Sequence, residues 1–75
     1  MVFEKVRALI AEQFDIDEDK ITMDSDVLDD FELDSMDIVD LIMTLEEEYE
    51  IEVPDEDVEE LRKISGIVKY IEDRI

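Results

Sequence analysis

The apolar residues of this chain recur at spacings of three and four, and no segment shows sustained alternation of apolar and polar residues. Spacings of three and four place side chains on one face of an α-helix, whereas a half-buried strand repeats at every second residue. The only glycine and the only proline both lie where a helix is expected to begin or end. The sequence therefore predicts an all-α fold.

The periodic segments also indicate where the first three helices begin and end. A first helix covers residues 2–14. Asp34 has the side chain and the position of an N-cap for a second helix, which runs to about Tyr49. The single proline interrupts the helical pattern, and Asp55 or a neighbour caps a short third helix over about residues 56–61.

The last helix is expected to begin with Ser65 as its N-cap and to place Tyr70 at the edge of its apolar side. Residues 15–32 form a long first loop, which its own apolar side chains tie to the helices. We expect one domain over residues 1–75, a small four-helix bundle with three longer helices and one short one. The apolar residues concerned are Ile67, Val68, Ile71 and Ile75 in the last helix and Ile16, Ile21, Met23, Val27, Leu28 and Phe31 in the loop.

The chain is strongly acidic, with 26 aspartates and glutamates against 7 lysines and arginines and a formal net charge of −19. Residues 21–61 contain 18 acids and no base. Such a surface repels nucleic acid and anionic membranes, and it attracts basic protein surfaces or divalent cations. No apolar run reaches the ~18–20 residues of a membrane span, and the charged N-terminal segment is unlike a signal peptide. We expect a cytoplasmic monomer without nucleic-acid partners or stable membrane insertion.

Histidine and cysteine are absent, so the common nucleophile–base pairs and the nitrogen and sulfur metal ligands are absent as well. Close carboxylate pairs carry no information in a chain with 26 acids. A catalytic pair also needs a cleft that shields one carboxylate and raises its pKa, and a bundle of 75 residues has little room for one. We therefore predict a protein that is not an enzyme and has no catalytic residues.

The start of the long loop raises a different class of function, a divalent-cation-binding module. Asp15, Asp17 and Asp19 match the first, third and fifth positions of an EF-hand loop. Lys20 then occupies the position of the turn glycine, and Asp26 occupies that of the bidentate glutamate. We expect no dedicated metal site here, only weak screening of the acidic surface by divalent cations.

The second helix carries more apolar residues than one buried face requires. With about 100° between successive residues, five of them form a first stripe that suffices for packing against the other helices. Three more form a second stripe ringed by carboxylates, which must stay hydrated. We expect this second stripe to be exposed and to serve transient docking of basic partners. The first stripe is Ile38, Leu41, Ile42, Leu45 and Tyr49, and the second stripe is Met36, Val39 and Met43.

Three segments resemble the acyl carrier protein family: Asp34-Ser35-Met36, Leu45-Glu46-Glu47-Glu48-Tyr49 and Val53-Pro54-Asp55. The resemblance covers nearly the whole chain. It implies that Ser35 is the attachment point of 4′-phosphopantetheine, with Asp34 as the helix cap beside it. A separate phosphopantetheinyl transferase, a holo-acyl carrier protein synthase, would take this group from coenzyme A. The thiol of the attached arm would carry acyl groups as thioesters, which explains how a chain without cysteine or histidine serves acyl chemistry.

The resemblance also implies partners. Enzymes of fatty acid synthesis with basic docking surfaces would bind the second helix, and the acyl chain would be sheltered in the apolar interior. A carrier of another acyl pathway, of the polyketide, lipid A or D-alanyl transfer type, is the alternative. The implied docking residues are Met36, Asp37, Val39, Asp40, Met43, Glu46 and Glu47, and the implied sheltering residues are Ile42, Leu45, Ile51, Val58, Leu61 and Ile67.

The chain departs from the family pattern at two places. Many members have a Leu-Gly pair shortly before the Asp-Ser pair, and Phe31-Glu32-Leu33 stands there in this chain. The residue after the serine is often leucine, and here it is Met36, which keeps an apolar side chain that is not branched at Cβ. The missing glycine leaves the backbone just before the second helix as the part of the site that the sequence does not define.

Overall fold

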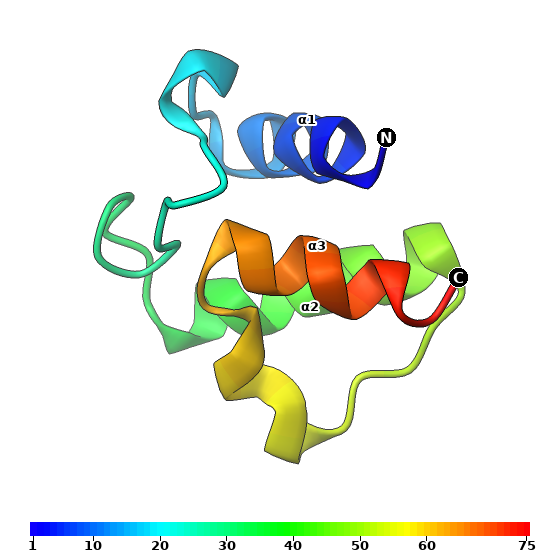
Figure 1. Cartoon of the computed structure of the whole chain (residues 1–75). Helices are drawn as coiled ribbons and strands as arrows, with labels where there is room; N and C mark the ends of the chain where they lie inside the picture. Colours follow the sequence, from blue (N-terminus) through cyan, green and yellow to red (C-terminus); the bar gives the residue numbers. More distant parts are fainter.

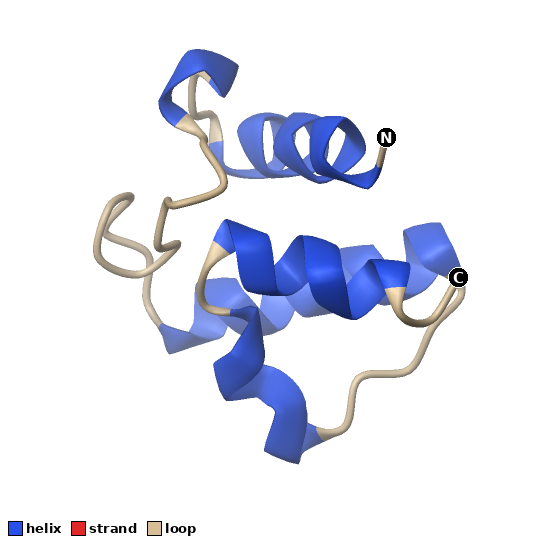
Figure 2. Cartoon of the chain, in the orientation of Figure 1, coloured by secondary structure: helices blue, strands red, loops and turns tan.

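The computed structural model describes all 75 residues, which form helices and loops without strands (Figures 1 and 2). It contains three α-helices, α1 (Val2–Phe14), α2 (Ser35–Tyr49) and α3 (Ile64–Glu72), and two 3₁₀ helices, η1 (Glu18–Lys20) and η2 (Asp55–Leu61). The predicted all-α bundle of three longer helices and one short one is confirmed. The short helix is η2, and the sequence pattern did not predict the single turn of η1.

The helices enclose one apolar core. α1 packs against α2 and α3, and η2 packs against α3; in Figure 1, α3 lies in front of α2, and α1 lies across the top. Each aliphatic side chain in this core contributes roughly 1.5–3 kcal/mol relative to an exposed one. The buried apolar residues are Val6, Ile10, Ile21, Val27, Ile38, Leu41, Ile42, Leu45, Leu61, Ile64, Ile67, Val68, Tyr70 and Ile71. None of the helices combines the length and the apolar character needed to span a membrane.

The ends of α1 and α2 share one arrangement. Asp15 follows α1 and Glu50 follows α2, and both adopt left-handed backbone angles with φ of 55°. Their N–H groups donate to the carbonyls of Ala11 and Glu46, which are among the carbonyls that lack a partner within the helix. Both helices therefore end without the glycine that usually takes this conformation.

The start of α3 differs from the prediction. Ser65 is not its N-cap: the helix begins at Ile64, with Lys63 in the cap position and no side-chain capping bond. The reason is a long-range pairing, because the N–H groups of Ile64 and Ser65 donate to the carbonyls of Ser25 and Met23, both at 3.0 Å. The first loop therefore satisfies helix donors that a side-chain cap would otherwise serve.

Two further predictions for α3 are wrong. Tyr70 is buried rather than at the edge, because its ring packs into the core and its hydroxyl donates to the Asp57 carboxylate of η2 at 2.7 Å. Ile75 is 67% exposed, because α3 ends at Glu72 and the last three residues lie beyond it. Gly66 lies in the first turn of α3, close to the helix boundary where it was expected.

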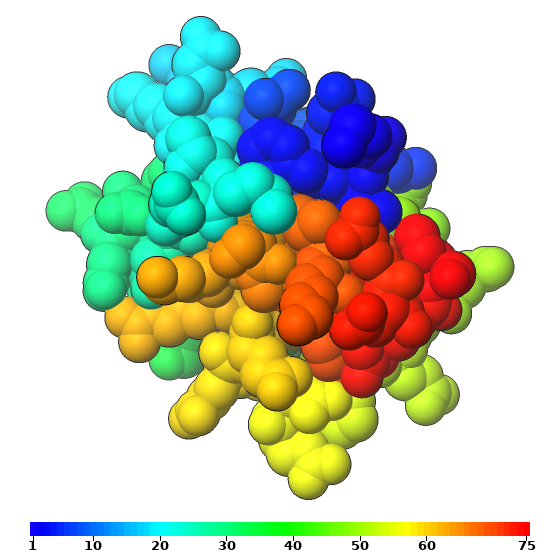
Figure 3. All heavy atoms as spheres, viewed as in Figure 1, coloured from blue at the N-terminus to red at the C-terminus, as the bar shows by residue number.

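The long first loop is held down mostly as predicted. Ile21 and Val27 are buried in the core, whereas Met23 is 40% exposed and does not anchor the loop. Ser25 is also buried, and it takes a hydrogen bond from the Thr22 N–H at 3.0 Å. In Figure 3 this part of the loop, coloured cyan, lies against the orange start of α3. The backbone bonds to α3 explain this contact.

Candidate functional site

Ser35 is the first residue of α2, and the chain around it folds for a local reason. Asp34, immediately before it, has extended backbone angles, and its carboxylate accepts a hydrogen bond from the Asp37 N–H at 3.0 Å. The Asp37 carboxylate accepts one from the Asp34 N–H at 3.1 Å, which completes a capping box. Asp34 is thus the N-cap that the sequence predicted. Because the two aspartates cap the helix, the Ser35 hydroxyl is not required for capping.

Exposure distinguishes Ser35 from the other serines. Ser25 is only 7% exposed, and its hydroxyl contacts the Thr22 hydroxyl at 3.2 Å. Ser65 is half-buried in the first turn of α3. Ser35 alone among the three is exposed. It is therefore the most accessible of the three serines to another protein.

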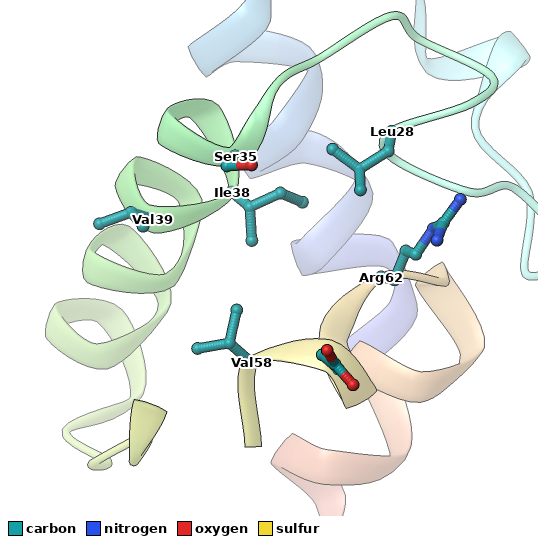
Figure 4. Close-up of a pocket in the computed structure, with 7 residues that line it drawn as sticks. Leu28, Ser35, Ile38, Val39, Val58 and Arg62 are labelled. Atoms are coloured by element: carbon teal, nitrogen blue, oxygen red, sulfur yellow. The ribbon is translucent and has the colours of Figure 1, made fainter. Parts of the chain in front are cut away.

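A groove of about 530 Å³ opens beside Ser35 (Figure 4). Leu28 from the first loop, Ile38 from α2 and Val58 from η2 point toward one another and form its apolar walls. Leu28 and Val58 are half-buried and Ile38 is buried, so the walls belong to the rim of the core. The other lining residues are Ser35, Val39, Glu59 and Arg62.

Arg62 is the one base that lines the groove, and it is tied to the first loop by two ion pairs. Its Nε lies 2.8 Å from Asp26 Oδ2, and its Nη2 lies 2.9 Å from Asp29 Oδ2. Partial burial alone would raise the pKa of Asp26. The Asp29 N–H, the Arg62 guanidinium and the Leu28 N–H outweigh that effect and hold the pKa of this carboxyl below its ordinary value. The hydrogen bond to Asp26 raises the pKa of Arg62 further.

The second stripe of α2 is exposed, as the sequence predicted. Met36, Val39 and Met43 have exposed fractions of 77%, 51% and 55%. Asp40 and Glu47 beside them are exposed and take part in none of the ion pairs of the structure. This part of α2 therefore presents apolar side chains next to unpaired negative charge.

Two of the predicted docking acids have partners inside the chain. Asp37 belongs to the capping box at the start of α2. The Glu46 carboxylate is half-buried and accepts a hydrogen bond from the Val53 N–H at 2.9 Å, which fixes the loop after α2. Asp37 and Glu46 therefore hold neighbouring backbone in place, whereas the Asp40 and Glu47 carboxylates make no such hydrogen bond.

Glu32 adopts the backbone conformation that a glycine before Asp34 would favour. Its φ is 56°, a left-handed conformation that favours glycine because it crowds a Cβ atom. A residue other than glycine in this conformation costs roughly 1–2 kcal/mol. The loop before α2 thus keeps a glycine-like backbone and stores a modest strain two residues before Asp34.

The groove is not built from the residues predicted to shelter an acyl chain. Ile42, Leu45, Leu61 and Ile67 are buried in the core, and Ile51 is half-buried away from the groove. Of the six, Val58 alone lines the groove. The sequence interpretation also missed Arg62, although Arg62 is the first base after the acidic stretch 21–61 and could have been singled out for that reason.

The segment that resembled a calcium loop has other partners. Asp15 ends α1 in a left-handed conformation, and Glu18 pairs with Arg7 at 3.3 Å. Asp26 pairs with Arg62. The structure holds no group of three or more carboxylates arranged to bind a metal ion.

The chain matches known proteins over nearly its whole length. The sequence model of a family described as "Phosphopantetheine attachment site" matches residues 4–71. The chain is 52% identical over 71 residues to the acyl carrier protein of Clostridium acetobutylicum, which covers 95% of this chain and 92% of that protein. It is 49% identical over 70 residues to that of Campylobacter jejuni subsp. doylei, covering 93% and 91%. It is 44% identical over 71 residues to that of Campylobacter lari, covering 95% and 92%. Each match spans the groove and Ser35.

Proposed function

The chain belongs to the acyl carrier protein family, and on that premise we propose that Ser35 is the residue that receives the 4′-phosphopantetheine arm. The family's cofactor is this arm, whose thiol carries acyl groups as thioesters. The chain is therefore a carrier of acyl intermediates, and the fatty acid synthesis role typical of the named relatives fits it.

The observation that supports Ser35 most strongly is its exposed hydroxyl at the start of α2, beside the apolar groove. The residues around it fit the group. A phosphodiester on Ser35 would lie at the positive end of the α2 dipole, which favours negative charge. Asp34 and Asp37 already accept backbone N–H groups in the capping box, so the helix start stays formed when the hydroxyl is used.

The chemistry of attachment needs a base that takes the proton of the Ser35 hydroxyl. In the proposed step the Ser35 oxygen forms a bond to the phosphorus of the phosphopantetheine phosphate of coenzyme A. The pyrophosphate bond breaks, and adenosine 3′,5′-bisphosphate leaves with the bonding electrons. The Asp34 and Asp37 carboxylates already accept backbone N–H groups, and the hydroxyl proton therefore passes to a base on the transferase. The role of this chain is to keep the Ser35 hydroxyl exposed at the start of α2.

We propose that the second stripe of α2 is the surface on which the transferase and the enzymes of fatty acid synthesis dock. Met36, Val39 and Met43 supply apolar contact area, and the free carboxylates of Asp40 and Glu47 steer basic surfaces toward it. Asp37 and Glu46 contribute charge from positions that the fold itself already uses. The groove beside this surface, with Val58 in its wall, is the entry by which an attached acyl chain reaches the apolar interior.

The same proposal covers the remaining features predicted from the sequence. The 75 residues act as one carrier domain, a cytoplasmic monomer that performs no catalysis and depends on partner enzymes. Relatives named acyl carrier proteins support a carrier over the divalent-cation-binding alternative. A specialised carrier of the polyketide, lipid A or D-alanyl transfer type is distinguished by which acyl-loading enzyme accepts the chain.

The test is modification by a phosphopantetheinyl transferase with coenzyme A, followed by intact mass spectrometry. The wild-type chain gains the mass of one phosphopantetheine, and Ser35→Ala gains none while keeping its far-ultraviolet circular dichroism. Ser65→Ala is the matched control, because it removes a hydroxyl from the first turn of a different helix, and it is modified like the wild type. Modification of Ser35→Ala would refute the assignment.

A further inference from the structure

Arg62 holds the first loop with both its backbone and its side chain. Its carbonyl accepts a hydrogen bond from the Val27 N–H at 2.9 Å, next to an antiparallel bridge between Asp26 and Lys63. Its guanidinium pairs with Asp26 and Asp29. One residue at the junction of η2 and α3 therefore contacts three of the four loop residues from 26 to 29, namely Asp26, Val27 and Asp29.

Leu28, a wall of the groove, lies inside this fixed segment. Its N–H donates to Asp26 Oδ1 at 2.9 Å, and the Asp29 N–H donates to the same oxygen at 3.1 Å. Asp26 thus accepts from the loop backbone with one carboxylate oxygen and from Arg62 with the other. Figure 4 shows the Arg62 guanidinium directed toward the loop that carries Leu28, and Leu28 facing Ile38 across the groove.

Movement of Leu28 away from Ile38 and Val58 widens the groove. Because the Leu28 N–H is bonded to Asp26 and Asp29 is the next residue in the chain, that movement strains both contacts with Arg62. Charge-assisted contacts of this geometry resist the movement. The Arg62 and Asp29 side chains are 47% and 71% exposed, however, so water screens their pair and the resistance is modest.

We infer that Arg62, through Asp26 and Asp29, sets the width of the groove beside Ser35 and thereby the length of acyl chain that the groove accepts. Arg62 is a positioning residue, because it acts on the chain through the Leu28 wall. The inference rests on the proposed function, since it concerns an acyl chain attached at Ser35. We call the contact of Arg62 with Asp26 and Asp29 the loop clamp.

The first experiment examines the unmodified chain and does not depend on attachment. In Arg62→Gln, amide hydrogen exchange at Leu28 and Asp29, whose N–H groups bond to Asp26, is expected to quicken by about fivefold relative to wild type. Arg74→Gln is the matched control, because Arg74 pairs with Asp57 at 3.8 Å and lies outside the groove. It leaves these two amides unchanged. Equal exchange at both amides in Arg62→Gln and wild type would overturn the inference.

The second experiment uses the loaded chain. A transferase attaches acetyl, hexanoyl, decanoyl and tetradecanoyl phosphopantetheine from the matching acyl-coenzyme A, and the melting temperature of each product is compared with that of the unacylated form. In the wild type the rise in melting temperature levels off at a certain chain length. In Arg62→Gln and in the milder Asp29→Asn it continues to longer chains, and Arg62→Lys restores part of the wild-type limit.

The outcomes separate the two proposals. Intact mass shows directly whether loading occurred, and a chain that gains no mass contradicts the attachment at Ser35. If all variants load and Arg62→Gln levels off at the wild-type chain length, as Arg74→Gln is expected to do, the loop clamp does not set the limit. Should Arg62→Gln fold poorly, Asp29→Asn carries the test, because Asp29 is on the surface and contacts only the clamp and its own loop.

Discussion

The carbonyl oxygen of Glu60 lies 2.3 Å from the place that a Cβ atom on Gly66 would occupy. This close approach seats the end of η2 on the first turn of α3, and only glycine leaves room for it. η2 also supplies Val58 to the groove. The packing of one glycine therefore positions a wall of the candidate site.

Gly66→Ala is expected to lower the free energy of unfolding by about 1–3 kcal/mol, because η2 must move away from α3. The sign is informative, since glycine to alanine within a helix otherwise stabilises by about 1 kcal/mol. Chemical denaturation measures the change. Ser65→Ala, the neighbouring substitution in the same turn, serves as the control and stays within about 0.5 kcal/mol of wild type. A Gly66→Ala variant more stable than wild type would show that the contact with Glu60 is easily relieved.

The two tyrosines predict opposite responses to loss of a hydroxyl. The Tyr49 hydroxyl is buried without a hydrogen-bond partner, and burial raises the Tyr49 pKa. Tyr49→Phe is therefore expected to stabilise the fold by about 1 kcal/mol. Tyr70→Phe removes the 2.7 Å bond to Asp57 and is expected to destabilise it by about 1–2 kcal/mol. Thermal melts of both variants provide the measurement, and a loss of stability in Tyr49→Phe would mean that its hydroxyl is satisfied in solution.

Relief of backbone strain at Glu32 gives a third prediction. Glu32→Gly is expected to stabilise the fold by about 1 kcal/mol, because glycine accepts a φ of 56° without crowding. Glu52→Gly removes the same charge at a residue whose φ is not positive, and it separates strain from electrostatics. Equal changes in unfolding free energy for the two variants would leave the strain explanation without support. Modification at Ser35 should proceed at the wild-type rate in both.

Acid titration tests the loop clamp through Asp26. A carboxyl whose pKa is lowered by folding stabilises the protein above its unfolded pKa, here the ordinary value of 3.8, and loses that contribution as the pH falls through the folded pKa. The difference in melting temperature between wild type and Asp26→Asn is therefore expected to be constant from pH 7 to about pH 5 and to shrink below 3.8. A difference that persists unchanged to pH 2 would mean that the charge of Asp26 does not contribute.

Docking on α2 is tested by comparing two exposed methionines. Met43→Ser is expected to weaken transferase binding by roughly tenfold, since Met43 is an exposed apolar residue of the second stripe. Met23→Ser changes the same side chain on the first loop and is expected to leave binding unchanged. Titration calorimetry at low and high salt gives both affinities, and high salt weakens binding of the wild type because it screens the acidic surface. Equal effects of the two substitutions would place the interface elsewhere.

Local sequence signals were sufficient where local interactions decide the structure. Asp34 was predictable as a cap because its partner, the Asp37 N–H, lies within the same helical turn. The two stripes of α2 followed from helical period alone, and the exposure of Met36 and Met43 agrees with it. The position of Ser35 at the start of α2 rests on the same local evidence.

Features built by residues distant in sequence were not predictable in this way. Ser65 has the chemistry of a cap, but Ile64 starts the helix because its N–H bonds to Ser25, nearly forty residues earlier. Leu28 and Val58 line the same groove, although they are thirty residues apart in the sequence. Helical period does not indicate how a loop and a 3₁₀ helix pack together. The left-handed backbone of Glu32 was also not predictable, because a glutamate does not indicate the conformation that the loop imposes.

The most direct test of the account is tandem mass spectrometry of the chain produced in bacterial cells. Fragmentation between residues 34 and 36 assigns any attached group to a single side chain. We predict one phosphopantetheine per chain, located on Ser35. A phosphopantetheine on Ser25 or Ser65, or a folded chain that stays unmodified after exposure to an active transferase and coenzyme A, would contradict the account.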